Sequence, residues 1–304
     1  MAASDTEIQW YGQVFKQDVY FLAQQKESRM IMCVDRDDDV LEGGFFDRLG
    51  ATSMVDIDTR FQPTPHIDDD HSRRYITWAM SVWSRLIDKV DKLKQLADAA
   101  SAYSRNARSA AGRKIDDVII AAMTGDAKSG KDGTTLVAFP AGQRILQAFE
   151  TDKWMSIVKW LEALRLLGSA EVNVEQNDIY ITMRQQDIIN LLQPTAISTT
   201  LANPLLSIDF STSKGLVDGT VKRYLGTEVI RSERILAGSE ASTFGVLVHQ
   251  KDGIGFTMPQ DFEFNLAKDP GFNYNWRPHL KIGLGAVRKE EVKVVCINAK
   301  NTKA

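Results

Sequence analysis

The chain has 304 residues, a formal net charge of -3, 43% hydrophobic residues and 25% charged residues, a composition typical of a soluble protein of about two domains. Its two cysteines, Cys33 and Cys296, are too few for a disulfide framework or a zinc site, which indicates a reduced compartment. No signal-peptide pattern or membrane-span-length apolar run is present, so neither secretion nor membrane insertion is indicated. The slightly acidic total argues against a sequence-specific nucleic-acid binder, although a locally basic surface can still face a polyanion.

The N-terminal segment is predicted to be an arm. Residues 6–32 carry apolar side chains at near-helical steps, which is typical of an amphipathic segment and defines an arm over residues 1–34. The arm either packs on its own domain or lies on a neighbouring subunit.

Residues 35–85 are predicted to form a long two-stranded hairpin with an irregular tip. Apolar and polar residues alternate along both strands. The apolar positions are Val55, Ile57 and Phe61 on the first strand, and Ile76, Trp78 and Met80 on the second. Because a two-stranded ribbon is marginally stable alone in water, its apolar face needs a partner. That partner is either the rest of the chain or another copy.

A long helix is predicted between Leu86 and Thr124, where apolar residues recur at three- and four-residue steps with one glycine and no proline. An unbroken helix would span about 58 Å, which is long for an ordinary domain. We therefore expect a break within 98–101, where aspartate and serine are good N-caps, and a second helix over residues 102–124. Gly125 is its expected C-terminal stop.

The second helix is basic in its first half. It carries Arg105, Arg108, Arg113 and Lys114, with no acidic residue from Ala99 to Lys114. Two interpretations stay open: a solvated helix face, or a surface turned toward packed nucleic acid, because phosphate contacts need positive charge but no base readout.

The rest of the chain completes a predicted α+β fold in which the long helix lies across a sheet. A compact α/β module is expected from about residue 145 to 255, and strands are expected again in the last third. The predicted elements are a polar loop at 125–133, strands at 136–139, 179–183, 227–231, 245–249, 261–266 and 292–297, a helix from a cap at Thr151 or Asp152 to Gly168, a short helix at 185–192, and a turn-rich connection at 269–278.

Motifs of catalysis and ligand binding are incomplete in this sequence. The run 125–132 comes close to a phosphate-binding loop, but Asp132 stands where that loop needs Ser or Thr, and the run follows a helix. Asp35, Asp37 and Asp39 imitate the start of a calcium loop without its glycine and glutamate. The run 253–258 lacks the third glycine of a dinucleotide site. No cofactor is therefore expected.

The histidines give no enzyme constellation. His249 and His279 are isolated from any nucleophile motif, so each is interpreted as structural. His66 and His71 flank three aspartates, which either hold a divalent metal or form a solvated acidic hairpin tip. The second interpretation is favoured, and no catalytic or metal residue is assigned.

The order of arm, extended hairpin, long helix, α/β module and returning strands resembles the major capsid proteins of tailed bacteriophages, which have the HK97-type fold. The run from Tyr103 to Ala122, followed by Gly125 and Asp132-Gly133-Thr134-Thr135, is similar to the spine-helix region of one phage capsid family. The stretches 215–230 and 285–288 are also similar to that family. The resemblance covers most of the chain in order.

The resemblance implies a domain plan and a function. Residues 1–34 are expected to be the N-terminal arm and 35–85 the extended loop that reaches a neighbouring subunit. Residues 86–144 and 256–304 are expected to form the peripheral domain with the spine helix, and 145–255 the axial domain. The expected function is a non-enzymatic shell protein that forms the hexamers and pentamers of an icosahedral virion.

Partners are implied in the same way. Similar proteins bind a scaffolding protein, meet a portal protein, in some cases carry a cement protein, and enclose double-stranded DNA without sequence specificity. Assembly is expected in the host cytoplasm, without a membrane partner. An encapsulin-like compartment with enzyme cargo is the alternative within the same fold, and a metal-binding protein or enzyme using the loop from His66 to His71 is the alternative from another class.

Overall fold

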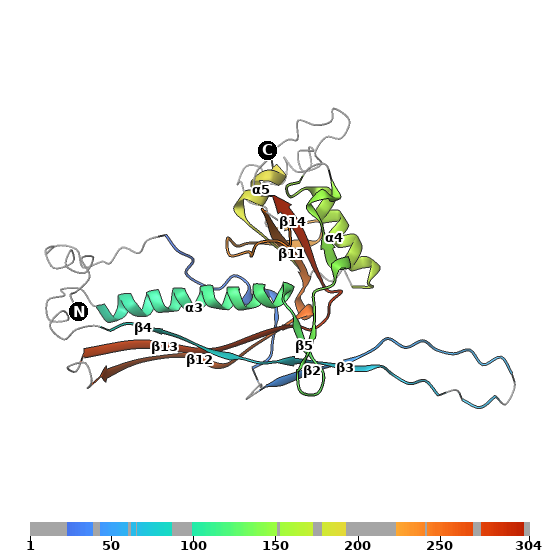
Figure 1. The fold of residues 1–304 in the computed structure, drawn as a ribbon, viewed down its shortest axis with the longest axis horizontal. Helices are drawn as coiled ribbons and strands as arrows, with labels where there is room; N and C mark the ends of the chain where they lie inside the picture. The colour runs from blue at the N-terminus through green and yellow to red at the C-terminus, as the bar shows by residue number, and fades with distance from the viewer. Residues whose placement is uncertain are drawn as a thin grey trace.

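The computed structural model of the chain describes residues 23–38, 43–59, 62–64, 66–86, 99–150, 153–172, 178–192, 223–240, 242–269 and 275–300. One long helix lies along a sheet of long strands, a second lobe stands at one end of this layer, and a narrow two-armed loop projects far beyond it (Figure 1). None of the helices within the described residues is long and apolar enough to cross a membrane.

The long helix is α3, Ala99–Thr124, with 26 residues, or about 39 Å at 1.5 Å per residue. It ends at Thr124 as predicted, and the amide of Gly125 still donates to the carbonyl of Ala121 at 2.9 Å. Its described start, Ala99, lies inside the predicted break region 98–101 and three residues before the predicted start at residue 102. Residues 87–98 fall outside the described part, so the break itself stays a prediction. Alanine, a strong helix former, recurs along α3, and proline is absent from it.

The sheet beside α3 has the strand order β1-β12-β13-β4. Its strands are β1 (Asp35–Arg36), β12 (Ile254–Asp269), β13 (Asn275–Arg288) and β4 (Ala79–Ser84). The long strands β12 and β13 form an antiparallel hairpin with two register irregularities. The helix lies along these strands and not across them (Figure 1), which corrects the predicted orientation. The strand β13 was not predicted, and its first residues had been assigned to a turn.

A hydrophobic core fills the space between α3 and this sheet. From α3 it takes buried residues including Ile115, Ile119 and Met123, and from the sheet Phe256, Leu280 and others. Met30 and Val34, in the segment before β1, are buried in the same cluster. The helix is therefore covered by the sheet on one side and by the end of the N-terminal segment on another.

The second lobe is a sheet of six strands in the order β7-β14-β11-β8-β10-β9. The strands are β7 (Arg144–Ile145), β14 (Val294–Lys300), β11 (Thr243–Gln250), β8 (Ile179–Met183), β10 (Thr227–Arg231) and β9 (Arg223–Tyr224). Helix α4 (Ile157–Ser169) packs on it through Trp160, Ala163 and Leu167, and α5 (Gln185–Leu192) contributes Ile188 and Leu191 to the same core. The cap of α4 is Ser156, whose hydroxyl accepts from the amide of Lys159, and not Thr151 or Asp152 as predicted.

The two lobes share strand β14. Its residues Val295 and Ile297 face the core beneath α4, whereas Val294 and Cys296 belong to the core around α3. Because successive side chains of a strand point to opposite faces, one strand serves both cores. Residues 294–300, which the prediction gives to the peripheral domain with all of 256–304, pair with β11 and β7 of the second lobe.

A third sheet, of order β2-β3-β5-β6, forms the base of the projecting loop. Its strands are β2 (Gly44–Leu49), β3 (His71–Ile76), β5 (Ala127–Ser129) and β6 (Thr135–Val137). The predicted polar loop 125–133 thus contains a strand. Short 3-10 helices are η1 (Ile31–Cys33), η2 (Ala141–Gln143), η3 (Gln147–Phe149) and η6 (Lys251–Gly253).

Candidate assembly and nucleic-acid surfaces

The projecting loop is anchored by a short ladder. Six residue pairs join β2 to β3, from Gly44 opposite Ile76 to Leu49 opposite His71, and the amide of Gly50 closes the ladder on the carbonyl of Asp70 at 2.8 Å. Beyond it, the described residues 51–59, 62–64 and 66–70 contain no strand and are all exposed. We call residues 51–70 the extended loop. The predicted paired strand at 55–61 is therefore wrong: the ladder lies nearer the body.

The hydrophobic residues assigned to the hairpin fall into different environments. Val55 and Ile57 are 53% and 61% exposed on the extended loop, and Phe61 lies outside the described residues. Ile76 is 0% exposed and packs with Ala127 and Val287 of its own chain, so the prediction of an intersubunit contact through this side chain is wrong. Trp78 packs against the same cluster, whereas Met80 is half-exposed on the edge strand β4.

One carboxylate fastens the base of the loop to the body. Glu291, in the turn after β13, accepts from Arg48 of β2 at 3.2 Å and from the buried Arg74 of β3. Arg48 also donates to the carbonyl of Lys289 at 3.0 Å. Burial lowers the pKa of Arg74, and the adjacent Glu291 carboxylate works against that shift. Two cations on one carboxylate thus fix the direction in which the extended loop leaves the body.

The basic residues of α3 do not share one face. Arg105, Arg108 and Lys114 are exposed, but at 100° per residue Arg105 and Lys114 point about 180° apart. Arg113 is used within the chain: its Nη1 donates to Gln24 Oε1 at 2.7 Å and to the Gln25 carbonyl at 3.2 Å. The expectation of one common basic side is therefore wrong, although a nucleic-acid role for the exposed members stays a prediction.

Asp116 holds the N-terminal segment against α3. Its side chain is fully buried and accepts hydrogen bonds from Ser28 Oγ at 2.6 Å, from the amides of Arg29 and Met30 at 3.1 to 3.2 Å, and from Gln25 Nε2. The two amides belong to the last residues before η1. The carboxylate therefore satisfies several buried donors at once, which is a strong form of hydrogen bonding.

The adjacent Asp117 has a different partner. It forms a two-point ion pair with Arg234, in the segment between β10 and β11, and both side chains are about one-third exposed. The hydrogen bond and charge of Asp117 raise the pKa of Arg234 further, against partial burial. Asp116 and Asp117 lie within the run from Tyr103 to Ala122 that resembles the phage capsid family. The sequence signal is a carboxylate pair inside an apolar helical run, where an unpartnered charge would be costly.

Arg288 closes the C-terminal end of α3. This fully buried guanidinium donates to the carbonyls of Met123, Gly125 and Val137 at 2.7 to 3.1 Å and lies over the Phe139 ring. Helix ends leave carbonyls without intrahelical partners and carry partial negative charge, which a cation stabilises. Burial is the main cause that lowers the pKa of Arg288. The stretch 285–288, noted in the sequence only as a resemblance, thus supplies a cap.

His249 lies buried beside the N-terminal segment, and its interpretation as a structural histidine stays a prediction. Its ring is 0% exposed, its Nε2 lies 3.0 Å from the carbonyl of Cys33, and it stacks on Tyr180. Burial lowers the pKa of His249 to about 4, with the Cys33 carbonyl acting in the opposite direction. The contact ties β11 to the N-terminal segment near η1. The ring is consequently neutral at pH 7.

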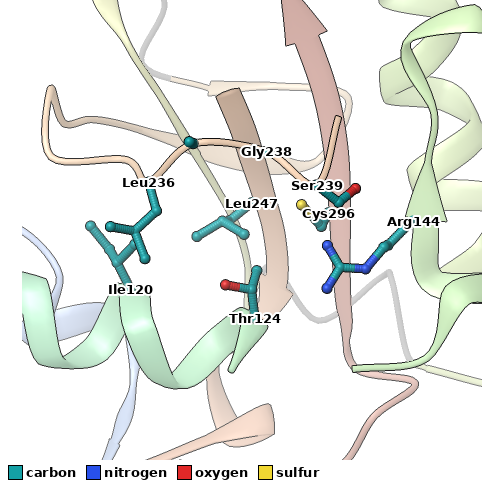
Figure 2. A pocket seen from close by; sticks show the side chains of 10 residues that line it. Ile120, Thr124, Arg144, Leu236, Gly238, Ser239, Leu247 and Cys296 are labelled. Carbon is teal, nitrogen blue, oxygen red and sulfur yellow. The ribbon is translucent and has the colours of Figure 1, made fainter. Parts of the chain in front are cut away.

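A cavity of about 230 Å³ lies where the two lobes meet, between the end of α3, the segment 236–239 and strands β11 and β14. Figure 2 shows Arg144 pointing into it, with the Cys296 sulfur at its wall and Ile120 and Leu247 on the apolar side. Burial raises the pKa of the Cys296 thiol to about 11, and that of Cys33 to about 12. Both cysteines are buried and free, and both stay protonated at neutral pH.

A larger groove of about 800 Å³ lies beside α3. It is bounded by the N-terminal segment, by the middle of α3, by β10 and by β12. Five cationic side chains line it together with one carboxylate, Glu27, and its apolar lining includes Met32, Met258 and Phe262. The five cations are Lys26, Arg29, Arg36, Arg108 and Arg231. We call this the basic groove; of the predicted basic residues it contains only Arg108.

The weak motifs of the sequence take ordinary forms in the structure. The run 125–132 forms β5 and the turn that leads to β6. His66 pairs with Asp68 at 2.9 Å, with both side chains largely exposed. Among the described residues, no three His, Cys, Asp or Glu side chains gather in a way that could hold a metal ion. Asp35 pairs with Lys289, and His279 lies near the carbonyl of Arg277.

A body with its own complete cores, carrying a long loop that packs on nothing in the described chain, has the architecture of a subunit built to assemble with copies of itself. The sequence places it in a known class: a family model described as phage capsid protein matches residues 8–301. The chain therefore belongs to the phage capsid protein family. Among curated proteins, no sequence matches it.

Solved capsid structures share the fold. The cyanophage Pam1 capsid subunit superposes with a TM-score of 0.72 at 12% identity, covering 96% of this chain and 97% of that one. The capsid of cyanophage P-SCSP1u gives 0.70 at 14% identity over 95% and 93%. The capsid of Ralstonia phage GP4 gives 0.70 at 11% identity over 96% and 95%. The predicted HK97-type capsid fold is confirmed, and the chain is a phage capsid protein that forms the shell of a virion.

Proposed function

We propose that this chain is the repeating subunit of an icosahedral shell, arranged as hexamers and pentamers, in which the extended loop of each subunit reaches a neighbour. The observation that carries this is the exposure of Met54, Val55 and Ile57 on a loop that projects from the body (Figure 1). Such a surface is unfavourable in water and marks a protein contact. A loop on one copy that binds a different surface on the next makes a heterologous contact, which closes into rings.

The predicted domain plan is kept in this proposal with two revisions: β4 moves from the predicted loop 35–85 to the peripheral domain, and residues 294–300 move to the axial domain. The peripheral domain would consist of α3, with the strands β4, β12 and β13 beside it. The axial domain would be the six-stranded lobe with α4 and α5, and it takes residues 294–300 as well as most of 145–255. The extended loop then connects subunits around the shell. The role of each part in the shell is inferred from the family fold.

The partners in this proposal are those of a genome-enclosing shell. They are a scaffolding protein during assembly, a portal protein at one vertex, in some cases a cement protein outside, and double-stranded DNA inside, with assembly in the host cytoplasm. No enzymatic activity is proposed. The exposed residues Arg105 and Lys114, on opposite sides of α3, would each add positive charge that retains DNA without base readout.

The extended loop can be tested by removal. Replacing residues 51–69 with Asn-Gly would join Gly50 to Asp70 through a two-residue hairpin turn while leaving the β2–β3 ladder intact. We expect a folded protein with the thermal midpoint of the full chain that forms no closed particles. Circular dichroism, sedimentation velocity and negative-stain microscopy measure these properties. Closed shells of normal size from the shortened chain would refute the proposed reach of the loop.

The DNA-facing surface needs a separate experiment. Arg105→Gln/Lys114→Gln removes exposed charges while sparing Arg113, which binds the N-terminal segment. We expect shells to form normally but to retain less DNA, with a shallower dependence on salt, because fewer phosphates are neutralised. Lys128→Gln/Lys131→Gln, near the β5–β6 turn, is the matched control. Equal DNA retention in all particles would refute the assignment, and particles filled with protein cargo instead of nucleic acid would favour the encapsulin-like alternative.

A further inference from the structure

We propose that the basic groove is the receptor for the extended loop of a second copy of this chain. The occupant is the segment 54–58, Met54-Val55-Asp56-Ile57-Asp58. This inference rests on the proposed shell function and adds to it the surface on which the loop docks. Its support comes from the shape, charge and exposed apolar area of the two surfaces.

The groove has a concentration of charge that the chain as a whole lacks. Five cations and one carboxylate line it, although the whole chain carries -3. Among the described residues, Lys26 and Arg108 have no ion-pair partner, whereas Arg36 pairs with Asp38. Uncompensated like charges around one groove repel each other, and an anionic occupant relieves that repulsion.

The groove is lined by apolar side chains as well as by cations. Met32 is 80% exposed and Phe262 is 43% exposed, and both line the groove with Met258. A nucleic-acid backbone would leave such side chains in contact with phosphates and water, so it gains little from them. A peptide that carries both apolar and acidic side chains matches both parts of the surface.

The extended loop has the complementary composition. Residues 51–70 contain five aspartates and one arginine. From Val55 to Asp58, apolar and acidic residues alternate, and Val55 and Ile57 are 53% and 61% exposed. In an extended segment, alternate residues point to opposite sides. Val55 and Ile57, on one side, can therefore meet the apolar lining, while Asp56 and Asp58, on the other side, meet the cations.

The contact has to be made between copies. Figure 1 shows the extended loop leaving the body on the side away from the N-terminal segment and the start of α3, and pointing outward. The ion pairs of Glu291 with Arg48 and Arg74 hold the base of the loop in this direction. The loop and the groove of one copy thus lie on different parts of the molecule, as a heterologous contact requires.

Disulfide trapping tests the pairing directly. The native cysteines are buried with raised thiol pKa values, so thiols introduced on the surface react selectively. One full-length variant carries Ile57→Cys and a second carries Met32→Cys. The two variants are mixed, allowed to assemble and mildly oxidised. The yield of disulfide-linked dimer should be at least 10-fold higher than from a control mixture of Ile57→Cys and Leu136→Cys. Leu136 is exposed and lies outside the groove. Equal yields would overturn the proposal.

Charge exchange tests whether the electrostatic match matters. Asp56→Lys/Asp58→Lys and Lys26→Glu/Arg108→Glu should each lower the assembled fraction at least 10-fold, and mixing the two should restore part of it. Lys128→Glu/Lys131→Glu, at exposed sites outside the groove, is the matched control and should assemble normally. Normal assembly of Lys26→Glu/Arg108→Glu would overturn the groove as the receptor. If Asp56→Lys/Asp58→Lys nevertheless did not assemble, the proposal that the loop reaches a neighbour would stand. No recovery in the mixture would overturn direct pairing.

Folding is checked in the same samples. Each variant is compared with the original chain by circular dichroism and thermal unfolding before assembly. If Lys26→Glu/Arg108→Glu does not fold, the neutral variant Lys26→Gln/Arg108→Gln replaces it. It should lower assembly several-fold, and unchanged assembly would overturn the proposal.

Discussion

Asp116 on α3 and Asp56 on the extended loop are both carboxylates within short apolar runs, but their surroundings are opposite. Asp116 is 0% exposed and accepts hydrogen bonds from the side chain of Ser28 and two backbone amides. Asp56 is exposed, as are its neighbours Val55 and Ile57. The first contributes to the stability of one subunit. In the proposed assembly, the extended loop around Asp56 contributes to stability only when another copy covers it. Different regions of the chain would therefore stabilise the folded subunit and the contact between subunits.

Removing the Asp116 carboxylate should have the largest effect on the body. Asp116→Ala leaves the hydroxyl of Ser28 and the amides of Arg29 and Met30 without their acceptor in a buried site. We expect a loss of about 3–5 kcal/mol in the free energy of unfolding, because unsatisfied buried donors keep their desolvation cost. Urea denaturation of the unassembled chain measures it.

The neighbouring carboxylate is its control. Asp117 forms a partly exposed ion pair with Arg234, so Asp117→Ala should cost less than about 1 kcal/mol. Similar losses for the two variants would contradict the distinction between a buried anchor and a surface pair.

Acid should lower the free energy of unfolding through His249, which contacts the N-terminal segment at the Cys33 carbonyl. Burial holds the pKa of its ring at about 4 in the folded chain, whereas an unfolded histidine titrates near about 6.5. As pH falls through this window, the unfolded state binds a proton that the folded state does not. Stability present above pH 6.5 is therefore lost progressively toward pH 4, by about 3 kcal/mol for this group.

Unfolding free energies measured between pH 7 and pH 4 check this dependence. His249→Gln should flatten the slope over this window, although it lowers stability at pH 7 by removing the contact with the Cys33 carbonyl. His66→Gln, on the exposed loop, should keep the original slope. An unchanged slope in the His249 variant would contradict the assignment.

Gly112 gives a smaller test of how closely the N-terminal segment lies on α3. A Cβ at this position would come within 2.9 Å of backbone atoms of Glu27 and Ser28. Gly112→Ala should therefore cost about 1–2 kcal/mol, because the clash outweighs the helix propensity that alanine adds. Gly168→Ala, in α4 with no atom within 4 Å of the added Cβ, should raise stability by about 0.5–1 kcal/mol. Thermal unfolding distinguishes these opposite signs.

Local signals predicted the helices well. The end of α3 and the span of α5 follow from residue spacing and stop signals, which act within a few residues. The long strand β13 was missed because Gly283 and Gly285 interrupt its apolar pattern. Their reason lies elsewhere in the chain: an added Cβ at Gly283 would meet the Trp78 ring at 3.0 Å, and one at Gly285 would meet the Thr77 carbonyl at 2.5 Å. Glycine in this strand allows a close crossing.

The functional surfaces were less predictable because they join distant segments. Asp116 meets donors 86 to 91 residues away in the sequence, and the basic groove combines four segments that no local pattern connects. Alternation within residues 55–61 suggested a strand there. The ladder instead formed at 44–49, where Phe46 can pack with Ile76 and Val287. The spacing of apolar residues along the sequence shows which side chains would lie on the same face of a strand. Which strands pair depends on whether those side chains can be buried together in one core.

Substitutions on the extended loop should have the smallest effect on the stability of the subunit but a large effect on assembly. Val55→Ser/Ile57→Ser replaces two exposed side chains that touch no described core. The unfolding free energy of the unassembled chain should therefore change by less than about 0.5 kcal/mol. Assembly should weaken, because each apolar side chain buried in a contact is worth about 1.5–3 kcal/mol. Leu136→Ser, another exposed apolar site, should alter neither property. Sedimentation velocity measures assembly and urea denaturation measures the unfolding free energy on the same samples. A loop variant that lost stability but still assembled would mean that Val55 and Ile57 stabilise their own subunit and not the contact between subunits.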